Sequence, residues 1–231
     1  MISLHKAECL FFAVMVHPTE YKLIIFDCDG TLVNSEPLTM RILSLMMREL
    51  GIERSDSALL EAFAGKNMKA ITDFVSSHIG PFDENTFEED YRQRCVQLFR
   101  KELQPIPGSI ELIKSVKTSK CIASNGPHRK MKISLSATGI NQYFKDEHIF
   151  SAYDIQKWKP DPALIYFALD RMKCKENEAI LIEDTMSGVN AGLTAGITTL
   201  AYNPEQDQDL LSSGALNFST MAEIKHYLNL V

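Results

Sequence analysis

The chain has 231 residues, of which 45% are hydrophobic and 23% are charged, and its formal net charge is -6. This length allows one large domain or a core that carries a smaller insert, and the composition is ordinary for a soluble globular protein. The acidic excess, without a basic stripe to offset it, argues against binding to nucleic acid.

The cysteines and the N-terminus carry little functional signal. The five cysteines are scattered, with no C-x-x-C pair and no zinc-ligand spacing, so we expect reduced thiols in a cytoplasmic protein. The apolar run at 10–16 is too short to span a bilayer and is not followed by a signal-peptide cleavage site. We therefore expect no membrane partner, and we interpret residues 1–20 as a non-catalytic N-terminal extension.

A short strand is predicted at 23–26, where an apolar run stops at Asp27-Cys28-Asp29-Gly30. Its branched and aromatic residues suit a strand that is buried on both faces. Because side-chain direction repeats every second residue on an extended backbone, Asp27 and Asp29 are expected to point to the same side. Two carboxylates so close need a nearby cation, although an isolated Asp-x-Asp-Gly is equally compatible with a solvated turn.

An all-helical block is predicted after this strand. Apolar residues recur at helical spacing in four segments, at 38–50, 56–63, 68–79 and 84–103. Ser35 with a following proline resembles a helix start, and the Pro-Ile-Pro-Gly segment that ends at Gly108 resembles a hinge. We predict a helical domain at 35–104, inserted into a core that consists of 21–34 and 105–231.

Beyond the hinge, helix and strand patterns alternate. This alternation predicts a Rossmann-like α/β fold, in which a parallel sheet is covered by helices on both faces. The predicted strands lie at 120–124, 147–151, 179–184 and 198–202, and the predicted helices lie at 109–117, from 127 onward, at 162–172 and at 187–195. The residues after 202 carry little signal.

Polar residues follow three of the predicted strands: Asp27 and Asp29, Ser124 and Asn125, and Glu183 and Asp184. Ligands of open parallel sheets bind at the carboxyl ends of the strands, so these residues are expected to share one site. Asp27, Asp29 and Asp184 could supply the hard oxygen ligands that Mg²⁺ prefers. Ser124 precedes a predicted helix start, a position suited to an anion.

Four motifs stand in the order and spacing of a known family: Asp27-x-Asp29-Gly30-Thr31, Ser124-Asn125, Lys159 in Lys-Pro-Asp-Pro, and Glu183-Asp184 followed by Ser187-Gly188. The chain thereby resembles the haloacid dehalogenase superfamily, in its phosphatase branch with a helical cap of the C1 type, over roughly 22–202. Two further stretches, at 124–131 and 153–163, are similar to bacterial phosphatases that act on 6-phosphogluconate and related sugar phosphates. Taken singly, Lys159 is typical of a solvated loop and Asp184 of a helix cap, but the coincidence of the motifs favours a site.

The resemblance implies a role for each motif residue. Asp27 would be the nucleophile that forms an aspartyl phosphate, and Asp29 would protonate the leaving oxygen and then activate water. The implied phosphate-binding residues are Ser124, Asn125 and Lys159. The implied Mg²⁺ ligands are Asp27, the backbone carbonyl of Asp29, Asp184 and, in or near the shell, Glu183.

The resemblance also implies where specificity lies. Gly65 and Lys66 belong to a loop of the helical block where family members contact substrate, and Lys66 would pair with a substrate carboxylate; a solvated lysine is an equally good interpretation. Asn34, at the cap hinge, stands where the family usually has aspartate. Mutases of the branch carry a histidine twelve residues after the nucleophile, where this chain has Thr39.

The predicted function is therefore Mg²⁺-dependent hydrolysis of a small sugar or sugar-acid phosphate. A sugar-phosphate mutase and a catalytically idle relative that binds a metabolite or a partner are the alternatives. We expect a small phosphorylated metabolite as the binding partner and a monomer as the oligomeric state, which the sequence itself does not define.

Overall fold

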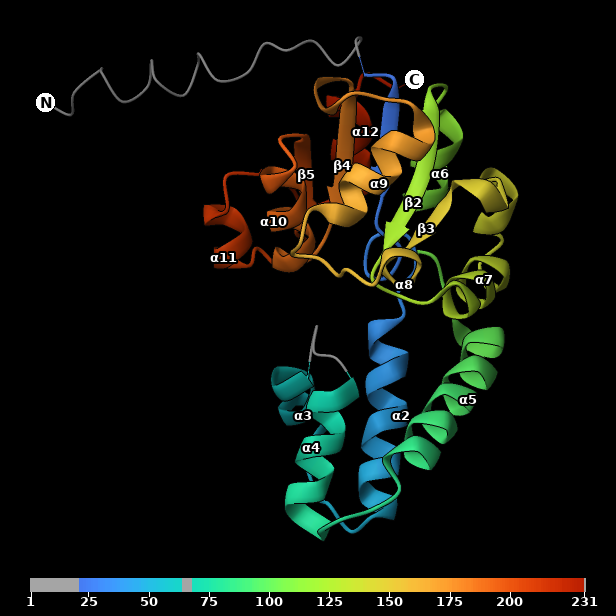
Figure 1. Cartoon of the computed structure of the whole chain (residues 1–231), viewed down its shortest axis with the longest axis vertical. Coiled ribbons are helices and arrows are strands. Elements are labelled where there is room, and N and C mark those ends of the chain that lie inside the picture. The colour runs from blue at the N-terminus through green and yellow to red at the C-terminus, as the bar shows by residue number, and fades with distance from the viewer. Residues whose placement is uncertain (1–20, 64–67, 231) are drawn as a thin grey trace, which may run out of the picture.

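The apolar run at the start of the core forms the central strand of a parallel sheet in the computed structural model, which describes residues 21–63 and 68–230 (Figure 1). The strands, in their order across the sheet, are β3 (Ile149–Ser151), β2 (Ser119–Ser124), β1 (Leu23–Phe26), β4 (Ala179–Glu183), β5 (Thr198–Tyr202) and β6 (Leu216–Phe218). Every neighbouring pair is parallel, and Leu23 lies opposite both Ser119 and Ala179. This order is typical of doubly wound sheets.

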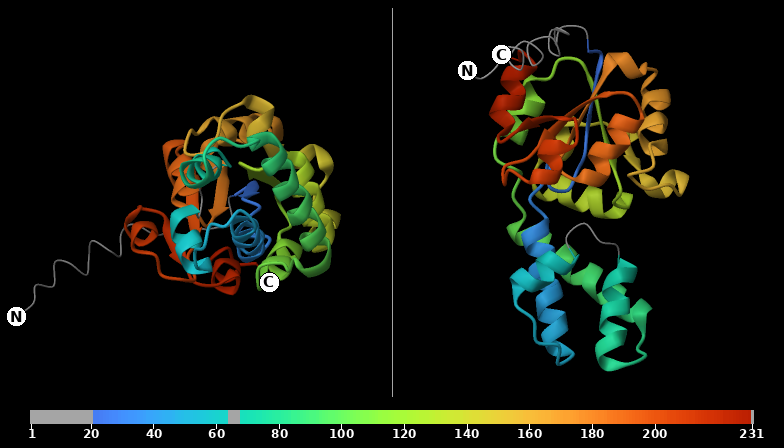
Figure 2. Two further views of the ribbon diagram at one scale, coloured as in Figure 1. Left: turned by 90° about the horizontal axis from the view of Figure 1, so that it is seen from below. Right: turned by 90° about the vertical axis from the view of Figure 1, so that its left-hand side faces the viewer.

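Both faces of the sheet are buried, which explains why β1 is apolar throughout. Leu23 and Ile25 pack into one cluster, toward α9 (Ala163–Met172) and α10 (Met186–Thr194). Ile24 and Phe26 pack into the other, together with residues of α6 (Ser109–Ser115), α7 (His128–Ala137) and α12 (Met221–Tyr227). The right-hand view of Figure 2 shows these two helical layers on either side of the sheet. The predicted Rossmann-like α/β fold is confirmed.

The four helices between β1 and β2 form the predicted helical insert. They are α2 (Glu36–Glu49), α3 (Asp56–Phe63), α4 (Met68–Ile79) and α5 (Glu84–Glu102), and they lie below the sheet in Figure 1. The buried residues of α2, among them Leu43 and Met47, recur at helical spacing and join the same apolar cluster as Phe26. Among the residues described, no helix is both long and apolar enough to cross a membrane.

Two antiparallel chain segments connect the insert to the core. The backbone N–H of Asn34 donates to the carbonyl of Gln104 at 3.0 Å, and the N–H of Ile106 donates to the carbonyl of Leu32 at 2.9 Å. We propose that the insert is bounded here, at residues 35 and 104, because these paired segments are the places where the chain leaves and re-enters the core.

The sixth strand and several short helices were not predicted from the sequence. Strand β6 has three residues, all of them only half-buried, so it lacks the apolar run that marks the other strands. The short helices are α8 (Ala152–Ile155), α11 (Gln208–Ser212), α12 (Met221–Tyr227) and the 3-10 turns at Ile140–Tyr143, Asp146–His148 and Glu176–Glu178. The predicted N-terminal extension at 1–20 and the predicted specificity residues Gly65 and Lys66 lie outside the described residues.

Candidate active site

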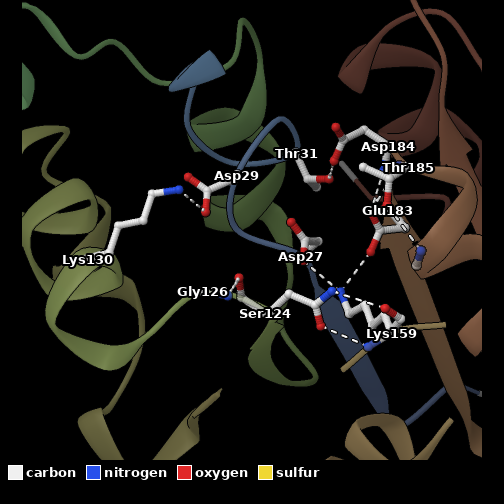
Figure 3. A network of polar contacts seen from close by, with 12 residues as sticks. Asp27, Asp29, Thr31, Ser124, Gly126, Lys130, Lys159, Glu183, Asp184 and Thr185 are labelled. Atoms are coloured by element: carbon white, nitrogen blue, oxygen red, sulfur yellow. Dashed lines mark hydrogen bonds and ion pairs between the residues drawn. The ribbon is translucent and has the colours of Figure 1, made fainter. Parts of the chain in front are cut away.

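The candidate site lies at the carboxyl end of β1, next to β4. Strands β2 and β3 follow on one side of β1 and strands β4 to β6 on the other, so this is the point where the chain changes its direction across the sheet. Asp27 follows β1 directly, its backbone N–H donates to the carbonyl of Ile182 on β4 at 3.0 Å, and the residue is 7% exposed. Figure 3 shows Asp27 at the centre of a network of polar residues that follow β1, β2 and β4, together with Lys130 of α7 and Lys159 of the loop before α9. The sheet topology therefore brings together motifs that are far apart in the sequence.

Lys159 lies between two carboxylates of this network. Its Nζ is 2.6 Å from Asp27 Oδ1 and 2.7 Å from Glu183 Oε2, and its side chain is 2% exposed. Asn125 fixes the loop that carries it, because its amide accepts from the backbone N–H of Lys159 at 2.9 Å and donates to the carbonyl of that residue at 3.2 Å. The side chain of Asn125, predicted to bind phosphate, is thus engaged with the backbone of Lys159.

Three carboxylates gather next to this lysine. Asp27, Glu183 and Asp184 each place an oxygen within 4.8 Å of the others. Thr31 Oγ1 donates to Asp184 Oδ1 at 2.7 Å, and a Cβ atom at Gly30, whose φ is 82°, would collide with Asp184 Oδ2. Only glycine leaves room for the Asp184 carboxylate. The hard oxygen donors of the three carboxylates fit a small divalent cation.

The start of α10 holds Glu183 in place. Glu183 Oε1 accepts from the backbone N–H groups of Asp184 and Thr185, each at 3.0 Å, and from Thr185 Oγ1 at 2.9 Å. Thr185 is also the N-cap of α10, since its Oγ1 accepts from the N–H of Gly188 at 3.1 Å. A Cβ at Gly188 would collide with Glu183 Oε2, which explains the glycine of the fourth motif.

The close carboxylates perturb one another. Burial raises the pKa of Asp27 to about 7, and the charge of Glu183 acts in the same direction while Lys159 opposes it. Burial also raises the pKa of Asp184 well above its usual value, reinforced by Glu183 and Asp27. Burial alone would lower the pKa of Lys159, but the two carboxylates that it contacts outweigh this effect and raise the pKa. A cation at this cluster would relieve the repulsion.

Asp29 does not point into the acidic cluster, contrary to the expectation that it shares a direction with Asp27. Its Oδ1 accepts from Ser35 Oγ at 2.6 Å and its Oδ2 lies 2.9 Å from Lys130 Nζ. Figure 3 shows the carboxylate turned toward Lys130 and away from Asp27. The physical reason is that the chain bends at Cys28 and turns at Gly30, so the alternation of an extended backbone ends after Phe26.

Ser124 lies beside Asp29 at the end of β2. It is 2% exposed, and its Oγ accepts from the backbone N–H of Gly126 at 3.1 Å. A Cβ at Gly126 would lie 3.4 Å from Ser124 Oγ and 3.5 Å from Asp29 Oδ2, so this loop packs directly against both side chains. Lys130 and Ser35 are the site residues that sequence reasoning missed. The one sequence feature that could have pointed to Lys130 is the stretch 124–131, which is similar to the sugar-phosphate phosphatases and includes this lysine.

The family is settled by comparison with known proteins. The model of the haloacid dehalogenase-like hydrolase family matches residues 24–202, which includes all four motifs. The chain belongs to the haloacid dehalogenase-like hydrolases. Each of the four family motifs contributes one residue to the network around Asp27. These residues are Asp27, Ser124, Lys159 and Asp184.

Relatives of this hydrolase include several phosphatases. It is 37% identical to the 6-phosphogluconate phosphatase of Escherichia coli over 180 residues, which cover 78% of this chain and 81% of the relative. It is 23% identical to a phosphorylated carbohydrates phosphatase of Thermotoga maritima, over 89% of this chain and 97% of the relative. Among solved structures, a haloacid dehalogenase-like protein of unknown function from Agrobacterium tumefaciens superposes with a TM-score of 0.78 at 25% identity, over 90% of this chain and 98% of that one. The phosphatase assignment made from the sequence is confirmed by these relatives.

Proposed function

We propose that the protein is a Mg²⁺-dependent phosphatase that hydrolyses a small sugar or sugar-acid phosphate through an aspartyl-phosphate intermediate. The observation that carries this proposal is the buried carboxylate of Asp27 at the end of the central strand, 2.6 Å from the ammonium of Lys159 and within the acidic cluster. The similarity to a 6-phosphogluconate phosphatase supports a sugar-acid phosphate as substrate.

The first half-reaction transfers the phosphoryl group to the enzyme. Asp27 attacks phosphorus, the bond to the leaving oxygen breaks, and Asp29 donates a proton to that oxygen. Because Asp29 faces Lys130 and Ser35 in the resting protein, its carboxylate has to turn toward Asp27 when substrate is bound. In the second half, Asp29 takes a proton from water, which attacks the aspartyl phosphate and releases phosphate.

The remaining residues stabilise charge. Ser124 and Lys159 bind the oxygens of the transferring phosphoryl group, and Asn125 and Glu183 keep Lys159 in position. Mg²⁺, held by Asp27, Asp184 and the carbonyl of Asp29, supplies Lewis-acid stabilisation of the phosphoryl oxygens when it is bound. Glu183, the third carboxylate of the cluster, would lie in or near the shell of that ion.

Replacement of the nucleophile tests this proposal. Asp27→Asn keeps the shape of the side chain but removes the attacking charge, so we expect phosphate release from 6-phosphogluconate to fall by at least ~10³-fold while the far-UV circular dichroism spectrum stays the same. The control is Asp209→Asn, which removes an exposed carboxylate on α11. Near-normal turnover by the Asp27 variant would refute the mechanism.

The two alternatives are separated by product analysis. A catalytically idle relative would release no phosphate from p-nitrophenyl phosphate with added Mg²⁺, whereas a mutase would convert a hexose 1-phosphate to its 6-phosphate without loss of phosphate. We expect phosphate release and no isomerisation, because Thr39 rather than histidine stands twelve residues after Asp27.

A further inference from the structure

A pocket of ≈ 440 Å³ lies between the helical insert and the core. Its insert side is formed by one face of α5, including Tyr91 and Phe99, and by Thr39 of α2. Its core side is formed by the segment that starts α7, including Arg129 and Lys130. Figure 1 shows α5 and α7 next to each other where the insert meets the core.

Lys130 belongs to this pocket and to the candidate active site at once. It lines the pocket, and its Nζ is 2.9 Å from Asp29 Oδ2. The side chains of Lys130 and Asp29 are 35% and 26% exposed, whereas that of Lys159 is 2% exposed. The Lys130–Asp29 pair is half-buried, whereas Lys159 is enclosed between two buried carboxylates, so Lys130 can exchange its partner at a smaller cost than Lys159.

The loop at Gly126 lies between Ser124, which is proposed to bind phosphate, and Lys130, which lines the pocket. A Cβ at Gly126 would lie 3.4 Å from Ser124 Oγ, 3.5 Å from Asp29 Oδ2 and 3.9 Å from Lys130 Cδ. Ser124, Asp29 and Lys130 thus lie around this one loop, and Lys130 also lines the pocket. Lys130 is therefore the pocket-lining cation that contacts Asp29, the residue proposed to protonate the leaving oxygen.

The charges of the pocket differ between its two sides. On the core side, the lining residues carry two cations, Arg129 and Lys130, and no carboxylate. The lining carboxylates, Glu88 and Glu89, both lie on α5, and Glu88 forms an ion pair with Arg92. The side of the pocket nearest to Asp29 is thus suited to an anionic group.

We propose that Lys130 is the specificity-determining residue for an anionic leaving group, and that its ammonium exchanges Asp29 for a carboxylate of the substrate in this pocket. This inference rests on the proposed phosphatase function. The exchange also frees Asp29 Oδ2 to turn toward the leaving oxygen. Sugar-acid phosphates are then preferred to neutral sugar phosphates.

The test compares two substrates that share a six-carbon chain and a terminal phosphate, 6-phosphogluconate and glucose 6-phosphate. We expect the wild-type protein to have the higher kcat/KM for 6-phosphogluconate, and Lys130→Met to lower the ratio of the two kcat/KM values by at least ~10-fold, mainly through KM for the acid. Loss of Lys130 also frees Asp29 with either substrate, which changes the ratio in the same direction, so KM for the acid is the measurement that reports recognition of the leaving group. Lys130→Gln is expected to give the same loss of selectivity, and Lys130→Arg to keep most of the preference.

The control is Lys132→Met, which removes the same charge from an exposed position on α7 and is expected to keep the wild-type ratio. A ratio that is unchanged in both neutral Lys130 variants, or a wild-type protein without preference for the acid, would overturn the inference. Hydrolysis of p-nitrophenyl phosphate by the wild-type protein distinguishes a failure of the role of Lys130 from a failure of the proposed phosphatase function. If that activity is present, such a result rejects only the role of Lys130; if it is absent, the proposed function itself fails.

Discussion

Gly30 controls the geometry of the acidic cluster although it carries no side chain. Its φ of 82° turns the chain away from the strand direction, and the space where a Cβ would stand is filled by the carboxylate of Asp184. Gly51 has a similar φ of 76°, but nothing lies within 4 Å of the position of its Cβ. The two glycines thus have the same backbone requirement and differ only in what a methyl group would meet.

Alanine substitutions at Gly30 and Gly51 separate the effect of backbone strain on stability from the effect of a methyl group on the active site. We expect Gly51→Ala to lose about 1–2 kcal/mol of the free energy of unfolding, because an alanine is strained at positive φ, and Gly30→Ala to lose at least as much. Only Gly30→Ala should displace Asp184, and we expect it to lower phosphate release at limiting Mg²⁺ by at least ~10-fold. Thermal unfolding and a Mg²⁺ titration of activity measure the two effects. Equal activity in the two variants would contradict the role assigned to Gly30.

At the scale of elements, the first turn of α10 serves the site as well as the helix. Thr185 Oγ1 accepts from the N–H of Gly188 and donates to Glu183, which in turn contacts Lys159. The chain of contacts runs from a helix N-cap to the residue proposed to bind phosphate. The fourth motif is therefore a structural unit in which the cap, the glycine and the acid depend on one another.

A second threonine cap provides a matched comparison. Thr220 caps α12 in the same way, accepting from the N–H of Glu223 at 3.1 Å, but it contributes nothing to the site. Thr185→Ala and Thr220→Ala should each cost ~1 kcal/mol of the free energy of unfolding. Only Thr185→Ala should lower kcat, and Thr185→Ser should restore it. The same loss of kcat in both alanine variants would show that the effect is one of general stability.

At the scale of the whole molecule, the balance of charge at the site couples folding to the metal. Three carboxylates lie close together and only one buried ammonium group contacts them, at Asp27 and Glu183, so the cluster repels itself when no cation is bound. A cation that binds only the folded state stabilises it, by ~2.7 kcal/mol at a hundredfold excess over Kd. For a chain of this size, we expect Mg²⁺ to raise Tm by roughly 5–10 °C.

Asp184→Asn should be more stable than the wild type without metal and should respond less to Mg²⁺, while Asp209→Asn should respond like the wild type. Differential scanning fluorimetry with EDTA or Mg²⁺ measures both, and phosphate release in excess EDTA should fall to background. A Tm that does not depend on Mg²⁺, or activity that persists in EDTA, would argue against the metal site.

The direction of the pH dependence follows from Asp27. Burial raises its pKa in the folded, metal-free protein to about 7, so the folded state holds a proton that the unfolded state has already lost. The contribution of this group to stability is therefore present at low pH and is lost as pH rises toward about 7. Because the proton competes with the cation, the rise of Tm on adding Mg²⁺ should be smaller at about pH 5.5 than at about pH 8. A larger effect at the lower pH would contradict this linkage.

The helical insert and the parallel core could be predicted because their signals are local. The buried strand β1 is a continuous apolar run, and α2 shows its buried residues at helical spacing. Strand β6 could not be predicted, since its residues Leu216–Phe218 are half-buried and depend on pairing with β5 for their extended form. A short edge strand has no periodicity of its own to detect.

The sequence alone determined the family, the order of the motifs and the convergence of Asp27, Ser124 and Asp184 at one edge of the sheet, because strand patterns and motif spacing are local and parallel strands end at the same edge. The tertiary structure alone decided how the other residues are used. Asp29 faces Lys130 and Ser35, and Asn125 holds the backbone of Lys159. These contacts join different loops, and their geometry depends on the turn at Gly30 and on how α7 packs beside it, which no local pattern specifies.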